Sequence, residues 1–145
     1  MLKHDVVGGA LFTPDLKRVL LLQRAHYRTF WPGEWYFLSE HKEPLESDLD
    51  ALKRGCVEEL GLDGIVQVGA PINLQGLVCN GHIFDFRLYP CILPPGQILL
   101  NKENEAFVWH DVSRLANGYP SVESRGDLLS LAVRNVQQLK QKKYF

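Results

Sequence analysis

The segment 46–62 constrains this chain more than any other, because its apolar residues recur at helical spacing and its ends carry helix-capping residues. Ser47 is a favourable N-cap, with Asp50 three residues later, and Gly61 stands where a left-handed residue ends many helices. Four apolar side chains are predicted to face a core: Leu49, Leu52, Cys56 and Leu60. The segment therefore predicts one amphipathic helix packed on the body of the protein.

A second side of the predicted helix carries acids. Glu58 and Glu59 are predicted to lie together with position 55, away from the apolar stripe. Adjacent carboxylates beside a core suit a hard divalent cation such as magnesium, which prefers oxygen ligands. The helix also has four charged residues at intervals of four: Glu46, Asp50, Arg54 and Glu58. As a helix pattern alone, this spacing favours a solvated ladder of salt bridges over a metal site.

The segment resembles the Nudix box, the signature of hydrolases that cleave a nucleoside diphosphate linked to another group. The pattern runs Gly, five residues, Glu, seven residues, then Arg-Glu-apolar-x-Glu-Glu-x-Gly-apolar. Seven residues stand at their places in this pattern: Glu46, Arg54, Cys56, Glu58, Glu59, Gly61 and Leu62. Two residues depart from it. Glu40 replaces the first glycine, and Gly55 replaces a glutamate that usually serves the family as a metal ligand or general base.

The resemblance implies a fold and an activity. The implied fold is α/β, a Nudix-type α/β/α sandwich with a mixed β-sheet between helices, formed as a single domain by residues 1–145. The implied activity is metal-dependent hydrolysis of a diphosphate linkage in a small nucleotide-like substrate, with Mg²⁺ or Mn²⁺ as cofactor. Because Gly55 departs from the box, we expect reduced or rearranged catalytic machinery, and Gly55→Glu is expected to restore a carboxylate and raise the rate. Specificity in this fold lies in loops outside the box.

The rest of the sequence predicts strands around this helix. Six runs have strand-like composition: 6–12, 19–24, 65–68, 72–78, 83–89 and 106–109. Asn80 and Gly81 predict a two-residue hairpin turn, and the strands after the helix are expected to form a meander. The segment 31–35, Trp-Pro-Gly-Glu-Trp, resembles the segment that leads into the box in several branches of the family. A short helix at 111–115 and a longer one through 128–139 complete the predicted elements.

Two further acids, Glu103 and Glu105, lie in the loop before the last expected strand. Without context they are ordinary surface charges. Many Nudix hydrolases keep an acid about six residues before a tryptophan in that strand, and Glu103 holds that place before Trp109. We expect one of these loop acids to come within direct or one-water reach of the helix acids, because two carboxylates leave most of the octahedral shell of magnesium to other ligands. Glu40 is a further candidate ligand.

The acids of the predicted helix and those of the loop before the last strand give the predicted site residues. The predicted metal ligands are Glu58, Glu59 and Glu103. The predicted catalytic residues are Glu58, Glu59, Glu103, Glu105 and Arg54. Arg54 is expected to orient carboxylates through bidentate hydrogen bonds. The predicted substrate-binding residues are Arg24, Arg28 and Glu46. Each of the two arginines is suited to phosphate, and each could equally be a solvated charge at a strand end.

Two alternatives remain open. Isopentenyl-diphosphate isomerases of Nudix type also lack the glutamate that Gly55 replaces, and they hold metal with a Glu-Asn-Glu loop and histidines. The segment 103–105 and the histidines His4 and His41 are similar, but Ser39 stands where that family has its catalytic cysteine. His4 and His41 are expected to converge on the acids only in such an enzyme. The other alternative is a Nudix-fold binding module without catalysis, which a titration with magnesium or manganese distinguishes.

The composition indicates which kinds of partner this chain is expected to bind. A formal net charge of −1 gives no electrostatic reason to bind polymeric nucleic acid. The chain has no long apolar segment and we expect no signal peptide, so we expect a cytoplasmic protein without membrane contact, with a small-molecule diphosphate as its partner. Cys56, Cys79 and Cys91 are expected to be buried reduced thiols rather than zinc ligands. The sequence leaves the oligomeric state open.

Overall fold

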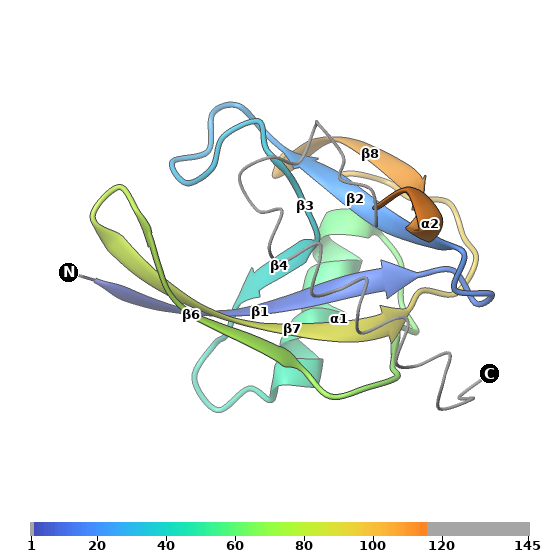
Figure 1. The fold of residues 1–145 in the computed structure, drawn as a ribbon, viewed down its shortest axis with the longest axis horizontal. Helices are drawn as coiled ribbons and strands as arrows, with labels where there is room; N and C mark the ends of the chain where they lie inside the picture. The colour runs from blue at the N-terminus through green and yellow to red at the C-terminus, as the bar shows by residue number, and fades with distance from the viewer. Residues whose placement is uncertain (1, 116–145) are drawn as a thin grey trace.

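A computed structural model describes residues 2–115 (Figure 1). Within this range the chain forms a mixed β-sheet with one long helix. The strands are β1 (Lys3–Phe12), β2 (Arg18–Arg24), β3 (Trp35–Tyr36), β4 (Leu38–His41), β5 (Val66–Gln67), β6 (Ile72–Cys79), β7 (His82–Ile92) and β8 (Asn104–Asp111). The helices are α1 (Asp48–Leu60) and α2 (Val112–Leu115). The helix predicted through 128–139 lies outside the described residues.

Strand β1 is the centre of the sheet. It runs parallel to β7 over its whole length. Its other edge is shared between two antiparallel strands, because residues 6–9 pair with β4 and Phe12 pairs with β2. Strand β8 pairs with β2. This arrangement places Glu40 opposite Val7, on the short strand that packs against α1.

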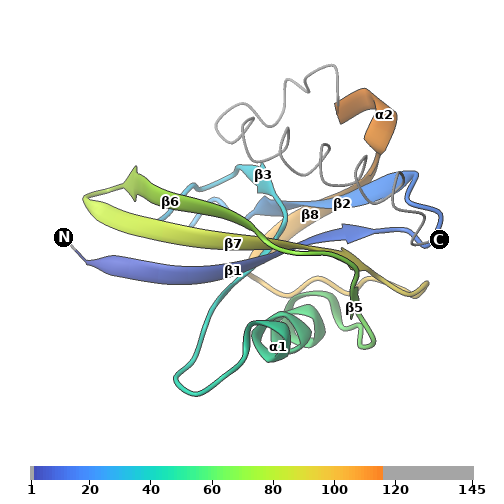
Figure 2. The ribbon, with the colours of Figure 1, turned by 60° about the horizontal axis from the view of Figure 1, so that its bottom comes forward.

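The alternation of side chains along the strands builds a core on each face of the sheet. In β1, Val6 and Ala10 belong to one core, whereas Val7 and Leu11 belong to the other. Helix α1 covers the second core with four fully buried side chains: Ala51, Leu52, Cys56 and Leu60. Burial of a leucine side chain such as that of Leu52 contributes roughly 1.5–3 kcal/mol to the free energy of unfolding. Figure 2 shows α1 on one side of the sheet and α2 on the other, which confirms the predicted α/β sandwich.

Helix α1 begins and ends as the sequence predicts. The Ser47 hydroxyl accepts a hydrogen bond from the backbone N–H of Asp50 at 3.1 Å, and Gly61 adopts a left-handed φ of 70°. The predicted position of its acids is partly wrong. Gly55 and Glu59 are buried, and Glu59 is only 4% exposed. The reason is tertiary, because β4 and the loop before β8 cover the flank of the helix that its own sequence leaves polar.

The predicted strands and turns are confirmed in part. Asn80 and Gly81 both have positive φ, 50° and 75°, which confirms the hairpin turn between β6 and β7. The predicted meander is wrong, because β5 pairs with β7 rather than with β6. The short strands β3 and β4 were not predicted. They consist of two and four residues, and long-range pairing with β2 and β1 defines them rather than a local pattern.

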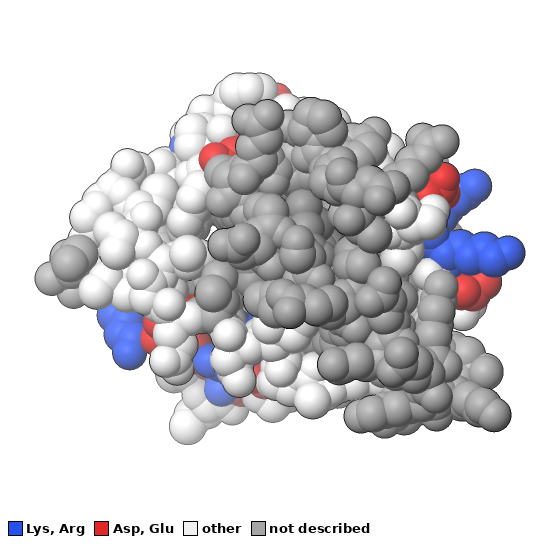
Figure 3. Space-filling model, viewed as in Figure 1, with Lys and Arg blue, Asp and Glu red and all other residues white. Residues whose placement is uncertain are grey.

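The surface carries charges of both signs. Figure 3 shows acidic and basic side chains next to one another at the periphery of the face seen in Figure 1. Two ion pairs of this kind join Lys3 to Asp85 at 3.1 Å and Arg18 to Asp111 at 3.6 Å. Among the described residues, neither helix has the length and apolar character that crossing a membrane requires.

Candidate active site

Three carboxylates from distant parts of the chain meet beside α1. Glu40 comes from β4, Glu59 from the last turn of α1, and Glu103 from the loop before β8. One oxygen of each lies within 4.8 Å of an oxygen of the other two. We call these three residues the carboxylate triplet. Glu103 therefore makes the approach to a helix acid that was expected of a loop acid.

Glu59 is the buried member of the carboxylate triplet, and Glu40 and Glu103 are partly exposed. Oε2 of Glu40 and Oε2 of Glu59 are buried and accept no hydrogen bond. Burial raises the pKa of Glu59 well above its usual range, and the neighbouring carboxylates raise it further. Burial is the main cause that raises the pKa of Glu40; its interactions with Glu59 and Arg54 lower this pKa, and the Glu103 carboxylate raises it further. Buried charge without a partner is costly, so the triplet has the properties of a site for a cation with oxygen ligands.

Arg54 holds the carboxylates next to the triplet. Its Nε and Nη2 donate to the two carboxylate oxygens of Glu46, at 2.9 and 3.0 Å, and Nη1 donates to Oε1 of Glu40 at 3.3 Å. Nη2 also donates to the backbone carbonyl of His41 at 3.0 Å. The Arg54 guanidinium lowers the pKa of Glu46 to about 2. Arg54 thus links the start of α1 to β4 in the orienting role that the sequence suggests.

Glu46 accepts three hydrogen bonds from neighbouring protein groups. Besides the two from Arg54, its Oε1 accepts a third from the backbone N–H of Glu43 at 3.0 Å. These contacts favour a role in orienting Arg54 over the substrate contact predicted for Glu46.

Two of the predicted catalytic acids lie outside the carboxylate triplet. The Glu58 side chain is 49% exposed, and its Oε2 lies 3.5 Å from Nη1 of Arg54. Glu105 is 38% exposed and pairs with His26. Glu40 takes the third place in the triplet, where the sequence put Glu58. The signal for Glu40 was its position at the first glycine of the box, but a sequence pattern does not say which side chains meet across strands.

Gly55 faces Glu40 directly. A Cβ added at position 55 would lie 2.6 Å from Oε2 of Glu40 and 2.7 Å from its Cγ, closer than real Cβ atoms come to other heavy atoms. A glycine inside a helix costs about 1 kcal/mol relative to alanine. Here the glycine makes room for the buried Glu40 side chain.

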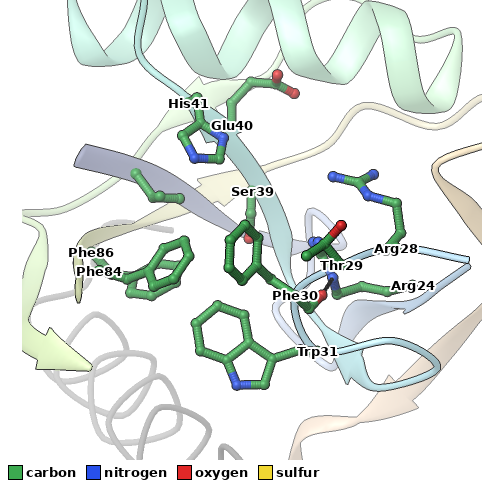
Figure 4. A pocket seen from close by; sticks show the side chains of 11 residues that line it. Arg24, Arg28, Thr29, Phe30, Trp31, Ser39, Glu40, His41, Phe84 and Phe86 are labelled. Atoms are coloured by element: carbon green, nitrogen blue, oxygen red, sulfur yellow. Dashed lines mark hydrogen bonds between the residues drawn. The ribbon is translucent and has the colours of Figure 1, made fainter. Parts of the chain in front are cut away.

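A pocket opens next to the triplet, with Glu40 in its wall (Figure 4). Three aromatic rings pack together on one side of it, with the Phe84 ring centroid 4.8 Å from that of Trp31 and 4.9 Å from that of Phe30. Arg24 and Arg28 lie on the other side. Arg28 Nη1 is 3.6 Å from Glu103 Oε2, so one arginine reaches the triplet itself. Both predicted phosphate-binding arginines therefore line the pocket.

The histidines form a group of their own. His4 Nδ1 lies 3.1 Å from His41 Nε2, and His4 Nε2 lies 2.8 Å from His82 Nδ1, both at hydrogen-bonding distance. The His4 ring stacks on Phe84 at a centroid distance of 4.4 Å. Burial lowers the pKa of His41, and the neighbouring His4 lowers it further. Within residues 2–115, none of these histidines joins the carboxylates in a group with metal-binding geometry.

The chain belongs to the Nudix family, because the family model described as NUDIX domain matches residues 2–130. No curated protein matches the chain.

Solved structures agree with this assignment. The C. elegans Ap4A hydrolase, in a binary complex, has a TM-score of 0.76 and 16% identity, covering 96% of this chain and 98% of that chain. The E. coli ORF135 protein has a TM-score of 0.66 and 25% identity, covering 99% and 95%. The NUDIX domain of Shewanella oneidensis NrtR, complexed with ADP ribose, has a TM-score of 0.68 and 17% identity, covering 94% and 90%. For the structures with 16% and 17% identity, the similarity shows a shared fold and nothing more.

Proposed function

We propose that this protein is a metal-dependent hydrolase that cleaves a diphosphate linkage in a small nucleotide-like substrate. The observation that carries the proposal is the carboxylate triplet, whose two buried oxygens, on Glu40 and Glu59, accept no hydrogen bond. Glu40, Glu59 and Glu103 would hold Mg²⁺ or Mn²⁺. When bound, such an ion neutralises charge on phosphate oxygens and lowers the pKa of a water molecule.

The remaining polar residues position the triplet and the phosphates. Arg54 fixes Glu40, and Asn104 donates to Glu59. Arg28, next to Glu103, and Arg24 line the pocket and would contact the phosphates of a diphosphate. Glu58 and Glu105 would act from the rim of the site, where their side chains are partly exposed.

The pocket would take one end of the substrate. Its volume of about 250 Å³ is below the 300–1,000 Å³ typical of pockets that enclose a whole ligand. A diphosphate ester would therefore place one ring-bearing group among Phe30, Trp31 and Phe84, and its phosphates outside, towards the triplet. Aromatic walls favour a flat ring, because offset and edge-to-face ring contacts are worth more than the buried area alone.

The test is a substrate screen on the purified full chain. Nucleoside diphosphate sugars, dinucleotides, nucleoside triphosphates and isopentenyl diphosphate are incubated with magnesium, and the products are separated by chromatography. We expect hydrolysis of at least one diphosphate, lost on chelation of the metal and in Glu59→Gln. The matched control is Glu43→Gln, because Glu43 is 66% exposed and lies outside the triplet.

Two outcomes would replace the proposal. Binding of metal and a nucleotide without turnover would identify a binding module. Conversion of isopentenyl diphosphate to its isomer would identify the isomerase alternative. The separation of His4 and His41 from the triplet argues against that second outcome.

A further inference from the structure

The two departures from the box, at positions 40 and 55, face each other in the fold. Glu40 lies on β4 and Gly55 in the middle of α1. The Oε2, Cγ and Cδ atoms of Glu40 lie 2.6, 2.7 and 3.0 Å from the point that a Cβ of residue 55 would occupy. The carboxylate of Glu40 therefore fills the space from which a side chain at position 55 would start.

We infer that Glu40 replaces the missing acid of position 55. Glycine and glutamate have exchanged places between α1 and β4, so the carboxylate reaches the metal site from β4 rather than from α1. This inference rests on the proposed metal site. Gly55 then has a positioning role, because any side chain there would push Glu40 out of the carboxylate triplet.

The hydrogen bonds of Glu40 fit the role of a ligand. Its Oε1 accepts from Arg54 Nη1 at 3.3 Å, and its Oε2 is buried with no hydrogen bond. Glu59 shows the same division, since its Oε1 accepts from Asn104 Nδ2 at 2.8 Å while its Oε2 accepts none. Each carboxylate thus has one oxygen held by a hydrogen bond from Arg54 or Asn104 and a second oxygen that is buried.

The geometry changes what Gly55→Glu should do. The box alone suggests that this substitution adds an acid and raises activity. In the fold, the new side chain would start inside the volume that Glu40 occupies, so it would displace one acid while adding another. The two positions are coupled, and only the double variant Glu40→Gly/Gly55→Glu should supply the carboxylate without a collision.

The experiment measures manganese affinity of the full chain, by electron paramagnetic resonance of free Mn²⁺ and by calorimetry. Neither readout requires a substrate. We expect Glu40→Gly and Gly55→Glu each to weaken manganese binding by at least about ten-fold, the scale seen when a metal site loses a ligand's support. The double variant should bind at least about ten-fold more tightly than either single variant, a coupling expected of residues in contact.

Two further variants separate a ligand from a structural residue. Glu40→Gln keeps an oxygen that can accept from Arg54 but loses the charge, so it should bind manganese as weakly as Glu40→Gly. Gly55→Ala adds one methyl group and favours the helix, so it should fold at least as well as the wild type and still weaken manganese binding. Glu43→Gln, also near Arg54 with a distance of 3.9 Å to Nε, is the matched control and should bind normally. Circular dichroism establishes that each variant is folded.

The outcomes distinguish this inference from the proposed function. Normal manganese binding by Glu40→Gln or Gly55→Ala would overturn the role of Glu40 while leaving the hydrolase proposal standing. Failure of the double variant to recover, although folded, would overturn the exchange. A wild-type chain that binds no manganese would overturn both.

Discussion

Asn104 donates a hydrogen bond from Nδ2 to Oε1 of Glu59 at 2.8 Å, and both residues are buried. This bond joins the first residue of β8 to the last turn of α1. It fixes one oxygen of the most buried acid of the carboxylate triplet and leaves the other oxygen facing Glu40 and Glu103. A sequence pattern of acids would not single out the asparagine between Glu103 and Glu105.

Asn104→Ala should therefore weaken the metal site without removing a ligand. The substitution leaves Glu59 free to turn, and loss of such an orienting partner typically lowers metal affinity by about 10–100-fold. Calorimetry with magnesium measures the change. Unchanged affinity in a folded variant would mean that the hydrogen bond does not orient Glu59.

Glu59→Gln and Glu58→Gln should differ, although the sequence treats these neighbours alike. Glu59 is 4% exposed and belongs to the carboxylate triplet, whereas the side chain of Glu58 is 49% exposed and lies beside Arg54. We expect Glu59→Gln to abolish binding of divalent metal with the fold intact, and Glu58→Gln to weaken it much less. Equal losses in parallel titrations would contradict the placement of the site.

Arg54→Lys should release Glu46 while keeping the positive charge. A lysine cannot donate the two parallel hydrogen bonds of a guanidinium. The pKa of Glu46 should therefore rise from about 2 towards its ordinary value of 4.5. Titration of the side-chain carboxyl ¹³C signal by NMR measures this shift. A pKa that stays near 2 would show that charge alone, rather than paired hydrogen bonds, holds Glu46.

Asp48→Asn should destabilise the fold in a pH-dependent way. Asp48 accepts hydrogen bonds from Arg87 Nε and Nη2, at 2.8 and 3.0 Å, and from Tyr89, which together lower its pKa. Hydrogen bonds to a charged group contribute about 1.5–3 kcal/mol to the free energy of unfolding. Because the folded pKa is depressed, this contribution is present in full above the unfolded pKa of about 4 and declines as the pH falls below it.

Urea unfolding at neutral and acid pH measures this effect. The matched control is Asp50→Asn, since Asp50 lies in the same helical turn and is exposed. A loss that is equal for both variants, or that grows as the pH falls, would contradict the assignment to the Arg87 pair.

Trp31→Leu should act on the substrate rather than on the metal. Trp31 lines the pocket and packs against Phe84 with a centroid distance of 4.8 Å. Losing an aromatic contact of about 0.5–1.5 kcal/mol should raise KM for a ring-bearing substrate by up to about ten-fold. Manganese affinity should not change. An unchanged KM would place the ring of the substrate elsewhere.

The local features of this fold follow from residues that are close together in the chain. The capping of α1 by Ser47 and Gly61 and the turn at Asn80 and Gly81 were predicted, because each depends on residues close together in the chain. Three residues of the predicted apolar stripe, Leu52, Cys56 and Leu60, are buried in the core, since helical spacing places them on one face, whereas Leu49 is only half-buried. The box pattern over 46–62 was also enough to indicate the family.

Which acids meet depends on contacts between segments that are far apart in the chain. Glu40 joins the carboxylate triplet because β4 pairs with β1 in a register that sets Glu40 opposite Val7 and against α1. Glu59 is buried because that strand and the loop carrying Glu103 cover its flank of the helix. Helical spacing placed Glu58 and Glu59 together, but it cannot show which of two adjacent side chains a distant segment will cover. Long-range pairing makes that choice, and no local pattern encodes it.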